Sequence, residues 1–181
     1  RYLEDLKIQT DNDRILAKAI TNSKAKVVLG YFFQADIDSA GHIEEKELRE
    51  HLNDVQSSEY KSISYSSETA KQAPLIEVVS PQSNIRLISE TTGYSGYFNM
   101  FPDQDGVVRW LPAVLKCRES LYAPLSVAAV SAFFDKQLSI KVYEYGIGEI
   151  NIGDLSIPVD EIGQIVVNYR GPAKTFPHIP V

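Results

Sequence analysis

The sequence has a single cysteine and no long apolar run. Cys117 has no second cysteine to pair with, which excludes an internal disulfide and a cysteine-based zinc site. We expect its thiol to be a buried, small apolar group. Spanning a bilayer takes about 18 or more apolar residues, and the longest candidate, 122–134, is shorter and contains two serines. No apolar stretch follows the first charged residues, so they do not form a signal peptide.

Basic residues are fewer than acidic ones. The 181 residues include 18 Lys and Arg and 24 Asp and Glu, a net charge of −6. Binding to nucleic acid or to an anionic membrane surface needs a basic footprint, so this balance argues against both. The length is enough to bury one full hydrophobic core, and it allows one domain or two very small ones.

Helical and strand patterns alternate along the chain, which favours an α/β fold with a mixed β-sheet flanked by helices. Three helices are expected: one that begins at 10–13 and ends at 22–23 with an apolar face around Ile15 and Leu16, a charged one over 43–54, and one over 124–134 that is apolar nearly all round and therefore buried. The run 26–33 is expected to be a strand buried on both faces. The polar, serine-rich segment 56–73 is expected to be a long surface loop or a poorly ordered excursion.

The most organised stretch is 94–115. Two β-rich runs, 94–101 and 107–115, flank the sequence Pro-Asp-Gln-Asp-Gly at 102–106. Such residues are typical of turns, so the pattern predicts a β-hairpin in which Gly106 takes a positive φ.

One acidic segment is similar to a calcium-binding EF-hand loop. Asp36, Asp38 and Glu47 fall at ligand positions one, three and twelve, with Gly41 at position six. However, position five is Ala40, which offers no side-chain oxygen, and a strand rather than a helix is expected before the loop. We therefore interpret the segment as an acidic turn before a helix, and predict neither a metal nor a cofactor.

Enzyme signatures are incomplete. In Gly93-Tyr94-Ser95-Gly96 the second glycine comes one residue too early for a nucleophile elbow. The histidines, His42, His51 and His178, have no metal-ligand spacing. No catalytic residue is predicted.

Two arginines stand at strand ends, Arg109 after the predicted turn and Arg170 after a strand over 164–169. Arginine in such a position can form bidentate hydrogen bonds to a carboxylate or phosphate. The alternative for Arg109 is a local brace to the aspartates of the turn.

The stretch from Gly96 to Pro112 (GYFNMFPDQDGVVRWLP) resembles the signature of the CHASE type 2 sensory domain, an extracytoplasmic input module of bacterial cyclases and histidine kinases. The segments 157–163, 166–172 and 175–177 continue the resemblance in the same order. It implies that Asn99, Asp103, Asp105, Arg109, Asn168, Tyr169 and Arg170 are candidate ligand-binding residues.

The resemblance also implies a single sensory domain over 1–181 that is an internal portion of a larger one, since the family's opening βαβ segment and closing strand have no counterpart here. We therefore expect a non-enzymatic domain outside the cytoplasm, part of a membrane-anchored receptor, which senses a small ligand of unknown identity. Two alternatives stay open: a ligand-free dimerisation module, which would form a homodimer, and a hydrolase with an unrecognised acid-based site.

Overall fold

The computed structural model describes residues 11–36, 43–172, 175 and 177. Its α-helices are α2 (Asn12–Thr21), α4 (Glu45–Asp54), α5 (Arg86–Ser89) and α6 (Leu125–Phe134). Short 3₁₀ turns are η1 (Gln56–Ser58) and η2 (Thr69–Gln72). Within these residues, no helix combines the length and the apolar character needed to cross a membrane.

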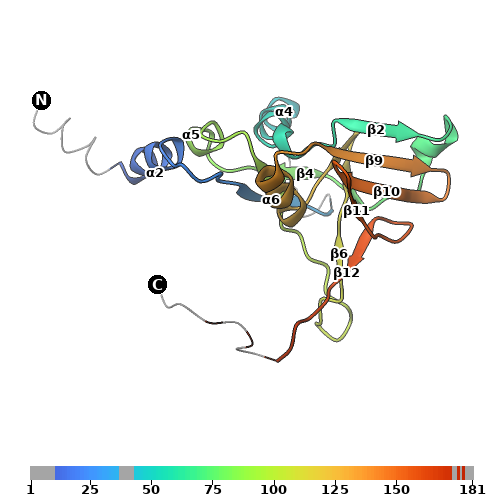
Figure 1. The fold of residues 1–181 in the computed structure, drawn as a ribbon. Helices are drawn as coiled ribbons and strands as arrows, with labels where there is room; N and C mark the ends of the chain where they lie inside the picture. Colours follow the sequence, from blue (N-terminus) through green and yellow to red (C-terminus); the bar gives the residue numbers. More distant parts are fainter. Residues whose placement is uncertain (1–10, 37–42, 173–174, 176, 178–181) are drawn as a thin grey trace, which may run out of the picture.

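Strands in the described chain form four small sheets around which the helices lie (Figure 1). They are β1 (Leu29–Gln34), β2 (Ser62–Tyr65), β3 (Glu77–Val78), β4 (Ser80–Gln82), β5 (Ser95–Tyr97), β6 (Trp110–Pro112), β7 (Leu115–Cys117), β8 (Ser120–Tyr122), β9 (Leu138–Tyr143), β10 (Gly146–Ile152), β11 (Leu155–Ile157) and β12 (Gln164–Val166). The sheet orders are β4-β1-β5, β11-β10-β9-β2, β12-β6 and β3-β7-β8. Three of these sheets contain both parallel and antiparallel pairs, which confirms the mixed α/β class.

Strand β1 forms from the apolar run as predicted, but only one of its faces is fully covered. Tyr31 and Phe33 point into a core that also contains Tyr97 of β5, while Phe32 between them is exposed. The prediction that both faces are buried was wrong, because the face that carries Phe32 is covered mainly at its start, where α6 approaches Gly30.

The serine-rich segment 56–73 is ordered structure, contrary to the predicted loop. Strand β2 pairs in parallel with β9, and η1 and η2 flank it. Tyr60 is 1% exposed and its hydroxyl donates to the Ala113 carbonyl at 2.8 Å. A few well-placed apolar side chains, Tyr60 and Ala70 among them, anchor this otherwise polar segment in the core.

The turn predicted within 94–115 is present, but the two strands that flank it do not pair with each other, so the hairpin prediction was wrong. Gly106 has φ +79°, and its N–H donates to the Asp103 carbonyl at 2.8 Å. The flanking strands separate, however: β5 pairs in parallel with β1, and β6 pairs antiparallel with β12. Each strand pairs with a partner distant in sequence: β5 is buried beside β1, whereas β6 keeps Trp110 exposed in its pairing with β12.

Helix α6 lies against β5 so closely that a side chain at Gly96 would collide with the helix backbone, 2.5 Å from the Leu125 Cα. Its inner face buries Val127, Ala128 and Ala132. The prediction of burial all round was wrong, because Phe133 is 79% exposed and nothing in the described chain covers the outer face.

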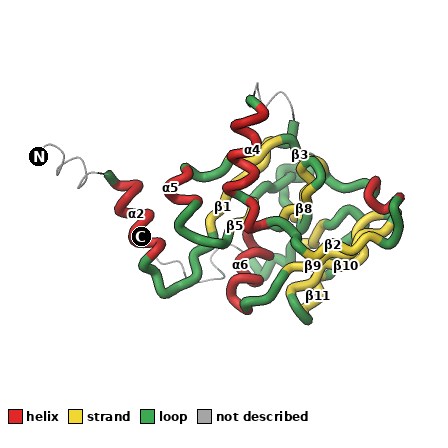
Figure 2. The backbone as a smooth tube through the Cα atoms, turned by 90° about the horizontal axis from the view of Figure 1, so that it is seen from above, coloured by secondary structure: helices red, strands yellow, loops and turns green. Residues whose placement is uncertain are grey.

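Helices α2 and α5 contact each other at one end of the molecule, beyond the sheets (Figures 1 and 2). We call this pair the helical arm. Asp11 caps α2, since its side chain accepts a hydrogen bond from the Arg14 N–H at 3.1 Å. The predicted apolar face of α2 is not buried: Ile15 and Leu16 are exposed, and only Ala17 is buried.

Candidate functional site

Three of the predicted ligand-binding residues meet at the turn before β6. The Arg109 guanidinium donates from Nη1 to Asp103 Oδ2 at 2.8 Å and to Asp105 Oδ1 at 2.9 Å, and from Nη2 to Asp105 Oδ2 at 2.8 Å. The hydrogen bond from Arg109 is the main reason that the pKa of the Asp105 carboxyl lies below its usual range, and the hydrogen bond from the Val107 N–H lowers it further. The predicted local brace is therefore present.

Tyr169 joins this turn from the end of the chain. Its hydroxyl donates to the Val108 carbonyl at 2.7 Å, and the Val167 N–H donates to the Arg109 carbonyl at 2.8 Å. Asn168 and Arg170 are exposed, and neither forms a hydrogen bond or ion pair with another described residue. The segment that follows β12 therefore lies alongside Val108 and Arg109, the residues just before β6.

Asn99 lies apart from this turn and completes the sheet. Its Oδ1 accepts from the Phe33 N–H and its Nδ2 donates to the Phe33 carbonyl, both at 2.7 Å. The side chain thus extends the parallel β1–β5 ladder by one more pair of hydrogen bonds. Both polar ends of the amide are occupied within the fold.

A grip by Arg109 and Arg170 on a common anion stays a prediction. Both Nη atoms of Arg109 already donate to carboxylates. Two aspartates and one arginine leave the turn with one net negative charge, which repels an anion. The turn is therefore a weaker candidate for a ligand site than its sequence implied.

The EF-hand-like segment lies partly outside the described residues, since Asp38 falls there. Glu47 belongs to the first turn of α4, with its Oε1 3.7 Å from His51 Nε2. Among the residues that the structure describes, no three His, Cys, Asp or Glu side chains are placed to hold a metal ion.

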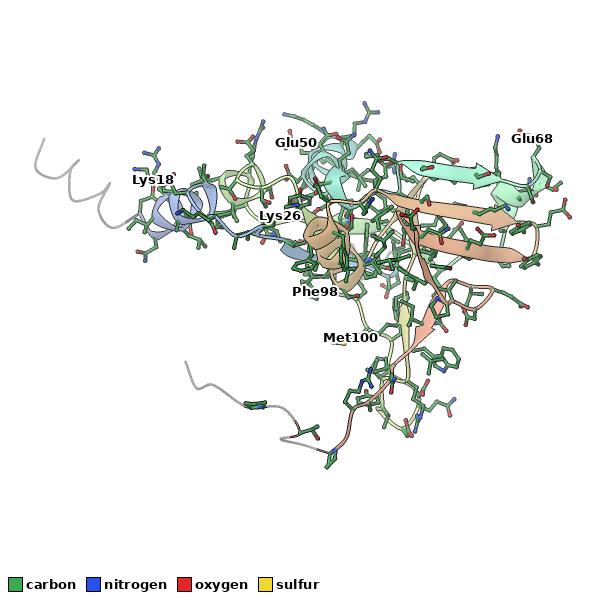
Figure 3. The ribbon with its side chains drawn as sticks, viewed as in Figure 1. Lys18, Lys26, Glu50, Glu68, Phe98 and Met100 are labelled. Carbon is green, nitrogen blue, oxygen red and sulfur yellow. The ribbon has the colours of Figure 1, made fainter. Side chains whose placement is uncertain are left out.

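A polar groove between α4 and α5 was not predicted from the sequence. We call it the α4–α5 groove; its volume is about 770 Å³. Glu47, Glu50, His51 and Asp54 line it from α4, and Arg86 of α5 and Glu90, which follows α5, line the other side. Glu50 stands on α4 at the top of the view in Figure 3. The pKa of Arg86 is raised by its hydrogen bond to Glu90, with smaller contributions from the charges of Asp54 and Glu50.

A chain of hydrogen bonds links His51, Ser83 and Asp54 at one side of this groove. Ser83 Oγ donates to Asp54 Oδ2 at 2.9 Å and lies 2.8 Å from His51 Nδ1. Because the single hydroxyl proton points to Asp54, the serine oxygen accepts from the imidazole Nδ1–H. These hydrogen bonds tie α4 to the segment between β4 and α5.

These three residues are the types found in a hydrolase triad, but their order differs. In a triad the histidine accepts the serine proton and the aspartate orients the histidine. Here the serine donates to the aspartate and stands between the two other groups. This arrangement holds two segments together and does not activate the serine oxygen as a nucleophile.

Two stretches of the chain line the groove: one runs from Glu47 to Lys61 and the other from Ser83 to Thr92. The one signal available to sequence reasoning was the spacing of His51 and Asp54 on a single helix face. Nothing local in the sequence identifies Ser83 as their partner.

Comparison with known proteins gives one finding. A family model described as the CHASE2 domain matches residues 3–181. No curated protein and no solved structure matches the chain.

Proposed function

Because the chain belongs to the CHASE2 domain family, we propose that it is the extracytoplasmic input domain of a bacterial membrane-anchored receptor. CHASE2 domains are extracellular sensory domains of signalling proteins. The match over almost the whole chain is the observation that carries this proposal. The chain passes a cue to a cytoplasmic output domain and performs no chemistry itself.

The ligand of this input domain is a small polar molecule that binds in the α4–α5 groove. Small ligands bind in concave clefts, where convergent polar groups fix their orientation, and the polar lining of this groove favours a polar ligand. This groove is bounded by separate elements of the chain, so a ligand that contacts both helices favours one relative position of α4 and α5 over another. A signal of this kind is limited by the difference in affinity between the two positions.

The groove is also connected to the rest of the fold. At its floor, Ser57 Oγ lies 2.7 Å from Ser95 Oγ of β5. On its α5 side, Asn84 Nδ2 donates to the Gly30 carbonyl of β1 at 2.9 Å. Helix α5 in turn contacts α2 in the helical arm. We expect a shift of α5 to move the arm relative to the sheets.

A ligand screen with a matched pair of variants tests this proposal. Ile85→Trp fills the α4–α5 groove, whereas Leu87→Trp changes another exposed apolar side chain, which lines the hollow between α2 and α5. Thermal unfolding of the purified chain is measured with amino acids, polyamines, dicarboxylates and sugars. At least one solute should raise the midpoint of the unaltered chain and of Leu87→Trp, but not of Ile85→Trp. Stabilisation that persists in Ile85→Trp would contradict the groove assignment.

A ligand-free dimerisation module is the second candidate, favoured by the exposed apolar face of α6 around Phe133 and Phe134. Sedimentation equilibrium of the unaltered chain and of Phe133→Ser distinguishes the candidates. A dimer that Phe133→Ser converts to monomer supports dimerisation through α6.

A further inference from the structure

Two tyrosines are stacked at the turn of the β9–β10 hairpin, at the end of the molecule opposite the helical arm (Figure 1). Strand β9 ends at Tyr143 and β10 begins at Gly146, so Tyr145 belongs to the two-residue connection. The ring centroids of Tyr143 and Tyr145 are 5.2 Å apart and the planes differ by 7°. Tyr145 is nevertheless 57% exposed.

The backbone of β10 makes room for this stack. A Cβ atom at Gly148 would lie 2.2 Å from Cε2 of Tyr143, so only a glycine allows the ring to lie against the strand. The absence of a side chain at Gly148 lets the Tyr143 ring lie against β10, and the Tyr143 ring in turn stacks on Tyr145. The exposed ring is thus held by its neighbours and does not hang freely in solvent.

The stack already accepts one cation from within the chain. Lys141 Nζ lies 5.3 Å from the centroid of the Tyr143 ring and 3.8 Å from Glu149 Oε1. The face of an aromatic ring carries negative electrostatic potential, which attracts ammonium and guanidinium groups. Tyr145 offers a second ring, and no cation of the described chain lies over it.

A hollow of about 610 Å³ adjoins Tyr145. Its lining combines aliphatic side chains and carboxylates, without a basic residue: Ile147, Val159, Ile162, Asp160 and Glu161. Asp160 Oδ1 accepts from the backbone N–H groups of Ile162 at 3.1 Å and Gln164 at 2.7 Å. The Ile147 N–H donates to the Glu161 carbonyl at 2.7 Å, so both sides of the hollow are braced by hydrogen bonds.

We propose that Tyr145 and this hollow bind a small organic cation with a methylated ammonium group. The Tyr145 ring face contacts the charged head, Asp160 and Glu161 supply the opposing charge, and the aliphatic side chains contact the methyl groups. An anionic ligand is repelled by the carboxylates, and a neutral one lacks the charge–charge attraction that a cation gains from them. This site shares no residue with the α4–α5 groove, so its test does not depend on whether a ligand binds in that groove.

Titration with tetramethylammonium chloride tests the proposal, with sodium chloride at equal ionic strength as the reference. Chemical shifts of Tyr145 and Gly148 amides in the full chain report binding. We expect Tyr145→Leu to weaken binding at least about fivefold and Tyr145→Phe, which keeps the ring, to change it less than about twofold. Glu161→Gln should weaken binding by a similar factor to the ring removal, and circular dichroism confirms that each variant is folded.

Two further probes identify the source of the cation. Choline should bind at least as tightly as tetramethylammonium, and the plain ammonium of lysine amide should bind more weakly, because it lacks the methyl groups and is more strongly hydrated. Shifts no larger than those with sodium chloride would overturn the proposal. So would equal binding by Tyr145→Leu, or tighter binding of lysine amide, which would indicate a protein side chain as the partner.

Discussion

Replacing Asn99 by alanine tests whether this residue stabilises the fold, as its hydrogen bonds indicate, or only contacts a ligand. The resemblance to the sensory family marks Asn99 and Asn168 alike as candidate ligand contacts. In the fold, however, Asn99 makes two hydrogen bonds of 2.7 Å to the Phe33 backbone, while Asn168 is exposed and unpaired within the described chain. Replacement of each by alanine should therefore have very different consequences.

The magnitude follows from the two hydrogen bonds that Asn99→Ala removes. Each is worth about 0.5–1.5 kcal/mol net, so the variant should lose about 1–3 kcal/mol of unfolding free energy. In a chain of this size, 1 kcal/mol corresponds to about 2–4 °C in Tm, which predicts a fall of about 4–8 °C for a loss near 2 kcal/mol. Asn168→Ala should change the free energy by less than about 0.5 kcal/mol, as surface substitutions usually do.

Urea unfolding followed by far-ultraviolet circular dichroism measures both variants. The slope of free energy against urea should stay constant, so that the shift in midpoint reports stability alone. If Asn99→Ala unfolds at the same midpoint as the unaltered chain, the argument that its amide completes the β1–β5 ladder is refuted.

Three further predictions concern other parts of the fold. Gly96→Ala should cost about 3 kcal/mol in urea unfolding, because its Cβ would lie 2.5 Å from the α6 backbone, while Gly93→Ala, with open space around it, should be near neutral; equal effects would refute the close approach of α6 to β5. The carboxylate of Asp105 has a lowered pKa, so its contribution to stability is present above the unfolded-state pKa of about 4 and is lost as the pH falls through the folded-state pKa. The stability difference between the unaltered chain and Asp105→Asn should therefore be largest near neutral pH and vanish in acid, and a difference independent of pH would contradict the brace. Burial raises the pKa of the Cys117 thiol to about 11, so a thiol reagent at pH 8 should label it only at the rate of unfolding, and rapid labelling of the native chain would show that it is accessible.

Local features of the fold could be predicted from the sequence, because their causes lie within a few residues. The Asp11 cap defines the start of α2, apolar periodicity indicates α2 and α4, and the residues at 102–106 determine a turn in which Gly106 has a positive φ. The brace from Arg109 to Asp103 and Asp105 spans only six residues, so its spacing was visible in the sequence as well.

Features that depend on distant partners could not be predicted. The hairpin prediction failed because β5 and β6 pair with β1 and β12, which lie far away along the chain. Burial of α6 depends on which neighbour covers its outer face, and its sequence alone does not contain that information. The role of Asn99 depends on Phe33, a residue 66 positions earlier.

The same limit applies to the candidate site. The α4–α5 groove joins His51 and Asp54 on one helix to Ser83 beyond β4, and the intervening segment had been expected to be a surface loop. In the structure α4 packs against β4, and this contact places His51 and Asp54 beside Ser83, just before α5. These contacts join residues about 30 positions apart, so no local pattern in the sequence could predict the groove.

The most direct test of the account measures the output of a membrane receptor that carries the full chain as its extracytoplasmic domain. Each solute that stabilises the purified chain is added outside the cell, and the activity of the cytoplasmic output domain is recorded for the unaltered chain, Ile85→Trp and Leu87→Trp. Such a solute should change the output of the unaltered receptor and of Leu87→Trp, and Ile85→Trp should abolish the response. A solute that binds in the groove and leaves the output unchanged would contradict the claim that this domain is a sensor.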